Sequence, residues 1–103
     1  MNVQIQTVHF DPDQKLLAHV QKKLDKLKTF HDKIMEVEVY LKLDNKSKKV
    51  RDKVAEIKVN IPKFSLFAKH ESKVFEESFD KAYDSLLSQI KKQREKEVKM
   101  TAA

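Results

Sequence analysis

The side chains best suited to chemistry are the imidazoles of four histidines, His9, His19, His31 and His70. No two of them have the i, i+4 spacing that places two imidazoles on one metal ion. His70-Glu71 is not followed by the second histidine of a metalloprotease helix. We therefore expect each histidine to be a surface or turn residue, and His70, at the end of a predicted strand, is the one to consider further.

Paired carboxylates are the next candidates, because two acids can share general acid and base roles. Asp11 and Asp13 form such a pair, but their place just before a predicted helix favours capping. Glu76 and Glu77 fall in a first helical turn, where the helix dipole favours acids. The chain has no cysteine and no glycine, which excludes disulfides, thiolate sites and glycine-rich phosphate loops. The sequence thus indicates a protein that is not an enzyme and needs no cofactor or metal.

Basic residues give a stronger signal, since 22 Lys and Arg against 16 Asp and Glu give a formal net charge of +6. Such an excess is typical of proteins that bind nucleic acid or a membrane surface, although it also serves solubility alone. The charges gather in three groups: five lysines of a predicted first helix (Lys15, Lys22, Lys23, Lys26 and Lys28), residues 42–53 and residues 91–99. Two basic helices side by side would follow two rows of phosphates by shape and charge.

The last basic group must be positioned by a helix over residues 75–94. Its apolar residues recur at spacings of three and four: Phe75, Phe79, Ala82, Tyr83, Leu86, Leu87 and Ile90. Ser72 is the expected N-cap. The pattern fades after Lys96, so we expect one domain over residues 1–97 and a frayed tail over 98–103.

Four alternating runs predict strands within residues 3–7, 34–43, 50–61 and 64–70, with turns at 44–49 and at Pro62-Lys63. Between the first two runs, Asp11 suits an N-cap, Pro12 the first helical position and Gln14 a capping box. This predicts a helix from residue 12 to about residue 30. Its apolar stripe consists of Leu16, Leu17, Val20, Leu24, Leu27 and Phe30.

The predicted order is strand, helix, three strands, helix, in a chain of 103 residues that is long enough for one core. Short connections favour an antiparallel meander for the last three strands, and the helical crossover favours a parallel first strand. Both helices should pack on one face of a four-stranded sheet, giving an α+β fold of βαβββα type. We find no signal peptide and no apolar run of about 20 residues, and with no cysteine we expect a cytoplasmic protein without membrane contacts.

Three segments resemble the short ribosome hibernation-promoting and ribosome-associated inhibitor proteins, also called the sigma-54 modulation family. They are KLDKL (23–27) followed by Phe30, VAEIKVNIP (54–62), and FDKAYD (79–84) continuing to QIKK (89–92). The resemblance covers about residues 1–96. It implies a βαβββα fold laid out like a double-stranded-RNA-binding domain. It also implies a non-enzymatic protein in the decoding channel of the small ribosomal subunit, where it blocks messenger and transfer RNA and holds idle ribosomes inactive in stress and stationary phase.

By matching positions, the resemblance implies that Lys23, Lys26, Lys92 and Arg94 contact ribosomal RNA phosphates. Charge and helical spacing add four neighbours, namely Lys22, Lys81, Lys91 and Lys96. We expect no small-molecule substrate.

The sequence departs from the family at Ser85 and Ser88, where a lysine and an arginine are common, and at Leu17, where a basic residue is frequent. Fewer phosphate contacts would weaken binding and flatten its salt dependence. Lys63 stands where the family usually has glycine, and about two extra residues occur around 72–74. Two alternatives remain: a generic double-stranded-RNA-binding module, and a small protein-interaction scaffold. An edge strand is free to pair with a copy of itself, so the oligomeric state is open, with a monomer favoured.

Overall fold

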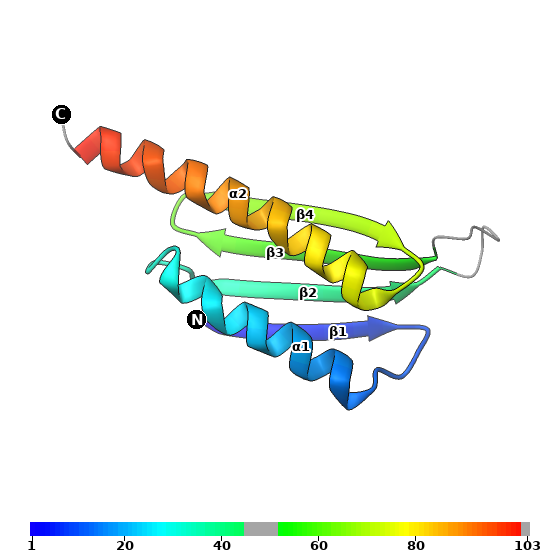
Figure 1. Cartoon of the computed structure of the whole chain (residues 1–103). Coiled ribbons are helices and arrows are strands. Elements are labelled where there is room, and N and C mark those ends of the chain that lie inside the picture. The colour runs from blue at the N-terminus through cyan, green and yellow to red at the C-terminus, as the bar shows by residue number, and fades with distance from the viewer. Residues whose placement is uncertain (45–51, 102–103) are drawn as a thin grey trace.

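The computed structural model describes the backbone of residues 1–44 and 52–101, and side chains as far as residue 98. Its elements are β1 (Asn2–Val8), α1 (Gln14–Asp25), the 3₁₀ helix η1 (Lys26–Thr29), β2 (Glu36–Leu43), β3 (Lys53–Ile61), β4 (Phe64–Ser72) and α2 (Phe75–Thr101) (Figure 1). The strands form one sheet in the order β1-β2-β3-β4. β1 is parallel to β2 and the other two pairs are antiparallel. The predicted α+β class, the βαβββα order and the strand pairing are confirmed.

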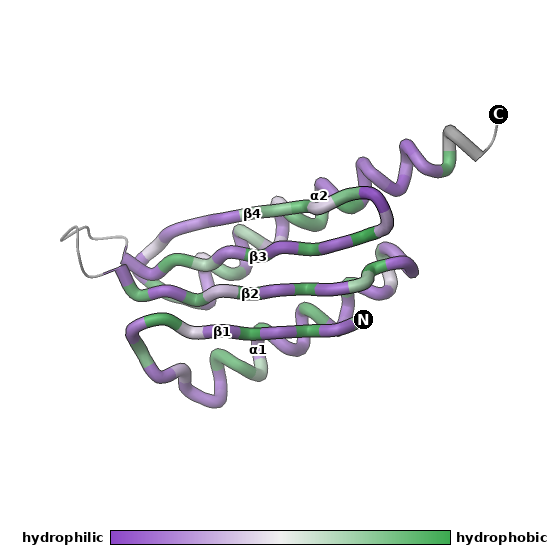
Figure 2. Tube along the Cα trace, turned by 180° about the vertical axis from the view of Figure 1, so that it is seen from behind, coloured by the Kyte–Doolittle hydropathy of each residue, from purple (hydrophilic) through white to green (hydrophobic). Residues whose placement is uncertain are grey.

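Both helices cover one face of the sheet (Figure 1), and the strand register explains why. Val39 is paired with Ile5 on one side and Ile57 on the other, so apolar rows run across the strands on the covered face. Figure 2 shows the matching alternation of hydrophilic and hydrophobic residues along the strands. The largest fully buried side chains include Phe79, Leu24, Leu27, Leu41, Ile57, Leu86 and Ile90. Burial of each contributes roughly 1.5–3 kcal/mol, so this core fixes both helices on the sheet.

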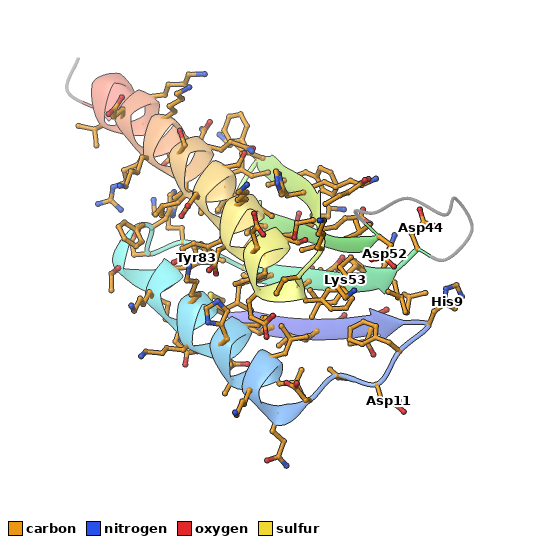
Figure 3. All side chains as sticks on the ribbon, turned by 45° about the vertical axis from the view of Figure 1, so that its right-hand side comes forward. His9, Asp11, Asp44, Asp52, Lys53 and Tyr83 are labelled. Carbon is orange, nitrogen blue, oxygen red and sulfur yellow. The ribbon has the colours of Figure 1, made fainter. Side chains whose placement is uncertain are left out.

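The start of α1 corrects the predicted cap. Asp13 is the N-cap, since its Oδ1 accepts a hydrogen bond from the Leu16 amide at 2.7 Å. Asp11 lies in the preceding loop (Figure 3), Pro12 is not helical, and the predicted capping box is wrong. The cause lies in tertiary structure: Phe10 stacks on Phe75 with ring centroids 4.3 Å apart, which ties the loop to the start of α2.

The end of the first helix also differs from the prediction of one α-helix to about residue 30. Regular α-helix stops at Asp25, and η1 continues through Thr29, whose hydroxyl donates to the Lys26 carbonyl at 2.7 Å. A 3₁₀ turn aligns residues three apart. Leu27 of η1 follows Leu24 of α1 by three residues, and both side chains are fully buried.

The start of α2 lies beyond the predicted cap. Ser72 is the last residue of β4, and its hydroxyl accepts from the Val74 amide at 3.2 Å and contacts the Val74 carbonyl at 2.6 Å. It therefore closes the strand-to-helix turn.

At the other end, α2 continues to Thr101, past Lys96 where the apolar pattern fades. These last turns project beyond the sheet as a mostly hydrophilic helix (Figures 1 and 2). Lysine, arginine and glutamate are good helix formers, and Glu97 in this segment also contacts His31 at 3.0 Å.

Part of one predicted basic group falls outside the described residues. Residues 45–51 include most of the predicted turn and the expected start of the third strand at Val50, and β3 is described from Lys53. The predicted turn at Pro62-Lys63 is confirmed. Lys63 has φ 72°, in the left-handed region that glycine enters most easily. A lysine there costs about 1 kcal/mol relative to glycine. The presence of lysine where the resembled family usually has glycine should therefore lower the stability of the fold by about that amount.

Candidate nucleic-acid interface

The predicted phosphate-binding side chains all come from α1, η1 and α2, which we call the two-helix layer. The two helices run side by side in the same direction (Figure 1), so their basic C-terminal ends lie at the same end of the molecule. Seven of the eight side chains are exposed and Lys23 is half-buried. The fold thus gathers basic residues that are about 70 positions apart in sequence into one layer.

Two of the predicted residues of α2 face the first helix. Lys91 places its Nζ 5.3 Å from the centroid of the Phe30 ring, and Arg94 Nη1 lies 3.4 Å from Asp32 Oδ1. Phe30 and Asp32 directly follow η1. The structure therefore brings Lys91 and Arg94 to the side of α2 that carries the lysines of α1 and η1.

The other flank of α2 faces the edge of the sheet. Gln89 donates to the carbonyl oxygen of Phe67 in β4 at 2.8 Å. Lys92 and Lys96 follow Gln89 by three and seven residues, which places them on the same flank of the helix. The structure thus separates Lys92 and Lys96 from the cations next to α1, and α2 carries basic side chains on both of its flanks.

A stripe on this second flank contains Ser85 and Ser88, at which the sequence departs from the pattern of the family that it resembles. Lys81, Ser85, Ser88 and Lys92 follow at spacings of four, three and four, so they line one side of the helix. Both serines are exposed, and Lys81 is paired with Glu77 at 3.1 Å. On α2, the lysines that make no ion pair with a described residue therefore all lie in the last turns, from Lys91 onward.

Ion pairs divide the eight predicted residues into two classes. Lys23, Lys81 and Arg94 each contact a carboxylate of this chain. The other five make no ion pair with any described residue: Lys22, Lys26, Lys91, Lys92 and Lys96. None of the five has to leave a carboxylate in order to contact a phosphate, and among them Lys91 alone has a described internal partner, the Phe30 ring.

Asp80 of α2 binds two side chains of α1. Its Oδ1 lies 2.8 Å from Lys23 Nζ and 2.6 Å from His19 Nε2, and the Lys23 ammonium also lies 5.3 Å from the centre of the Tyr83 ring. Partial burial of Asp80 opposes its ionisation. Hydrogen bonds from Lys23 and His19 and their charges outweigh this, so the pKa of the Asp80 carboxyl lies below its usual value.

Acid should weaken this clamp between the helices. An aspartate whose pKa is lower in the folded than in the unfolded chain stabilises the fold above its unfolded pKa of about 3.9. That contribution is lost as the pH falls through the lower pKa of folded Asp80. We expect Asp80→Asn to flatten the fall in stability below about pH 4, measured by urea unfolding across a pH series. Equal slopes for parent and variant would contradict this.

The histidines show what sequence spacing missed. His19 is half-buried at the interface of the helices, and His31, expected at the surface or in a turn, is only 1% exposed. The Lys33 amide donates to His31 Nδ1 at 3.0 Å, so Nε2 carries the proton and donates to Glu97 at 3.0 Å. This contact, between residues 66 positions apart, anchors the projecting end of α2.

A weak signal for the Asp80 site was present, since His19 and Lys23 are four residues apart on one helical face. No pattern in the sequence predicted that Glu97 would contact His31. Of the other two histidines, His9 is exposed in the turn after β1, as predicted, and His70 is half-buried on β4. Among the described residues, no three His, Asp or Glu side chains come together to hold a metal ion.

Tyr83 carries a buried hydroxyl that has no hydrogen-bond partner among the described residues. The side chain lies between the two helices (Figure 3), and burial together with the Asp84 carboxylate raises the pKa of the hydroxyl. An unpaired buried polar group destabilises a fold, so Tyr83→Phe should raise the free energy of unfolding by about 1 kcal/mol. Tyr40→Phe is the matched control, because the Tyr40 hydroxyl donates to Glu38 at 3.3 Å. Chemical denaturation that shows equal effects for the two variants would refute this.

With this geometry established, comparison with known proteins identifies the family. The family model described as "Sigma 54 modulation protein / S30EA ribosomal protein" matches residues 3–98. The chain belongs to this family. The match confirms the resemblance seen in the three sequence segments, and the family is one of ribosome-associated hibernation factors rather than of enzymes.

Solved structures of this type share the fold. The N-terminal domain of Thermus thermophilus Protein Y is 26% identical, with a TM-score of 0.75 over 89% of this chain and 98% of that one. A ribosomal subunit interface protein from Coxiella burnetii is 21% identical, with a TM-score of 0.79 over 91% of this chain and 98% of that one. No curated protein matches the chain.

In the part of the chain that the structure describes, no helix is long and apolar enough to span a membrane.

Proposed function

We propose that this protein is a cytoplasmic, ribosome-associated translation inhibitor. Residues 1–97 form a single domain that binds the small ribosomal subunit in its decoding channel and sterically blocks messenger and transfer RNA. Family membership and the likeness to a ribosomal subunit interface protein support a ribosomal partner. The observation that carries the proposal is that the two-helix layer holds five lysines that make no ion pair with a described residue. Lys22 lies in the last turn of α1 and Lys26 in η1, and Lys91, Lys92 and Lys96 lie in the C-terminal half of α2.

The proposed mechanism needs no bond-making chemistry. The core holds the helices rigidly on the sheet, and the unpaired lysines replace counterions condensed on ribosomal RNA. Each such contact adds roughly 0.7–0.9 to the slope of log affinity against log salt. With five contacts, the affinity should fall steeply as salt rises. The domain then blocks the channel by its volume, because the protein and a messenger or transfer RNA cannot occupy the same space.

Co-sedimentation with ribosomes and with separated subunits across a salt series tests the proposal. We expect saturable binding to the small subunit that decreases as salt rises and that lowers the binding of a messenger analogue and of transfer RNA. A bare RNA duplex of equal concentration should compete poorly. If the duplex binds as tightly as ribosomes do, the protein is a generic double-stranded-RNA-binding module. An absence of binding at every salt concentration would refute the proposal.

A further inference from the structure

Lys23 is held differently from the other cations of the interface. Its ammonium is drawn onto α2 by the Asp80 carboxylate at 2.8 Å and by the Tyr83 ring at 5.3 Å. Its side chain is only 28% exposed. The same Asp80 oxygen contacts His19, which fixes the carboxylate from a second position on α1. Lys23 therefore already has an anionic partner in the free protein.

The other two internal pairs of the interface are looser. Asp32 is 73% exposed and lies 3.4 Å from Arg94. Glu77 and Lys81 are neighbours on one helix, and both are about half exposed. Water and salt screen such exposed ion pairs, so the carboxylate holds the cation only weakly. Among the described interface cations, Lys23 is the one with a short, partly shielded pair to a carboxylate on the other helix.

A phosphate that approaches Lys23 meets this carboxylate. To contact the ammonium, the phosphate must either displace Asp80 or lie beside it, and a like charge at that distance opposes binding. Since the lysine is already neutralised, its contact would also release fewer counterions from the RNA.

We infer that Asp80 is an internal counterion that competes with RNA phosphate for Lys23 and thereby limits the affinity of the interface. This inference rests on the proposed function and deepens it, because it assigns an opposing role to a residue inside the same site. Asp80 is a positioning residue here, since it acts on RNA through Lys23.

The test compares Asp80→Asn with Asp84→Asn in the ribosome co-sedimentation assay. Asp84 is exposed one turn further along α2 and makes no ion pair with a described residue. Both variants gain the same charge, but only Asp80→Asn releases Lys23. We expect Asp80→Asn to bind about two- to fivefold more tightly than Asp84→Asn, the range that corresponds to one exposed ion pair. Its salt slope should also be steeper by about one phosphate contact.

A double variant shows whether the effect passes through Lys23. In a Lys23→Gln background, Asp80→Asn should improve binding no more than Asp84→Asn does, because no cation remains to be released. Thermal unfolding of each variant checks that the helices remain packed.

The outcomes separate this inference from the proposed function. If the parent binds ribosomes and Asp80→Asn binds no more tightly than Asp84→Asn, the inference alone is overturned. Weaker binding by Asp80→Asn would also overturn it, since Asp80 would then orient Lys23 toward RNA. A parent that does not bind ribosomes refutes the proposed function, and the inference with it.

Discussion

Reversing the charge of four unpaired cations is expected to lower affinity for ribosomes by about 10²- to 10³-fold at physiological salt. The variant replaces Lys22, Lys26, Lys92 and Lys96 by glutamate. Under the proposed function, each substitution removes one phosphate contact and adds a repulsive charge. None of the four lysines has an internal partner among the described residues, so the fold should be unaffected. Sedimentation at several salt concentrations measures both the loss of affinity and the shallower salt slope.

The choice of residues follows from the ion pairs. Reversal of Lys23 would set a carboxylate against Asp80 and loosen the contact between the helices, so a loss of binding could reflect damage to the fold. The matched control reverses four exposed lysines outside the two-helix layer: Lys58, Lys63, Lys69 and Lys73. Of these, Lys69 alone makes an ion pair with a described residue, a long one of 4.0 Å to Glu71. The change in net charge is the same, and we expect less than a tenfold effect. Equal losses for the two variants would show that net charge, and not this surface, determines binding.

Phe79→Ala is expected to destabilise the protein by about 3–5 kcal/mol. Phe79 is fully buried, contacts His19 edge-on with ring centroids 6.2 Å apart, and lies 6.0 Å from the Tyr83 ring. Truncation leaves a cavity where both helices meet the sheet. A domain of this size has a total stability of about 5–15 kcal/mol, so we expect the variant to unfold at a clearly lower temperature than the parent. Thermal and urea unfolding measure the loss.

Phe67→Ala is the control for this substitution. Phe67 lies on the uncovered face of β4 and is 51% exposed, so its truncation should cost less than about 1 kcal/mol. The same chemical change at two positions thus isolates burial as the cause. Similar unfolding midpoints for the Phe79→Ala and Phe67→Ala variants would show that this core contact does not hold α2 on the sheet.

Much of the fold could be predicted from local patterns. Val37, Val39 and Leu41 alternate with polar residues, and a strand with one apolar face needs a helix to cover it. The spacing of Phe75, Phe79 and Leu86 predicted that helix. Strand order followed from the lengths of the connections, since short ones favour antiparallel neighbours and a helical crossover favours a parallel pair. These features depend on residues close in sequence.

Element ends were predicted less well, because they depend on distant contacts. Asp11 and Asp13 both suit an N-cap by residue type, and the stacking of Phe10 on Phe75 selected Asp13. The apolar pattern ends near Lys96, yet the helix continues to Thr101 in a segment that Glu97 ties to buried His31.

The sequence by itself determined the fold class, the family and the presence of basic helices, since periodicity and composition are local properties. Tertiary structure alone decided which cations are unpaired. Lys23 and Lys26 look equivalent on the first helix, but packing of α2 places Asp80 against Lys23 and leaves Lys26 without a partner among the described residues. Charge pairing between helices depends on distance in space, and residues 61 positions apart, such as His19 and Asp80, meet only when the core has formed.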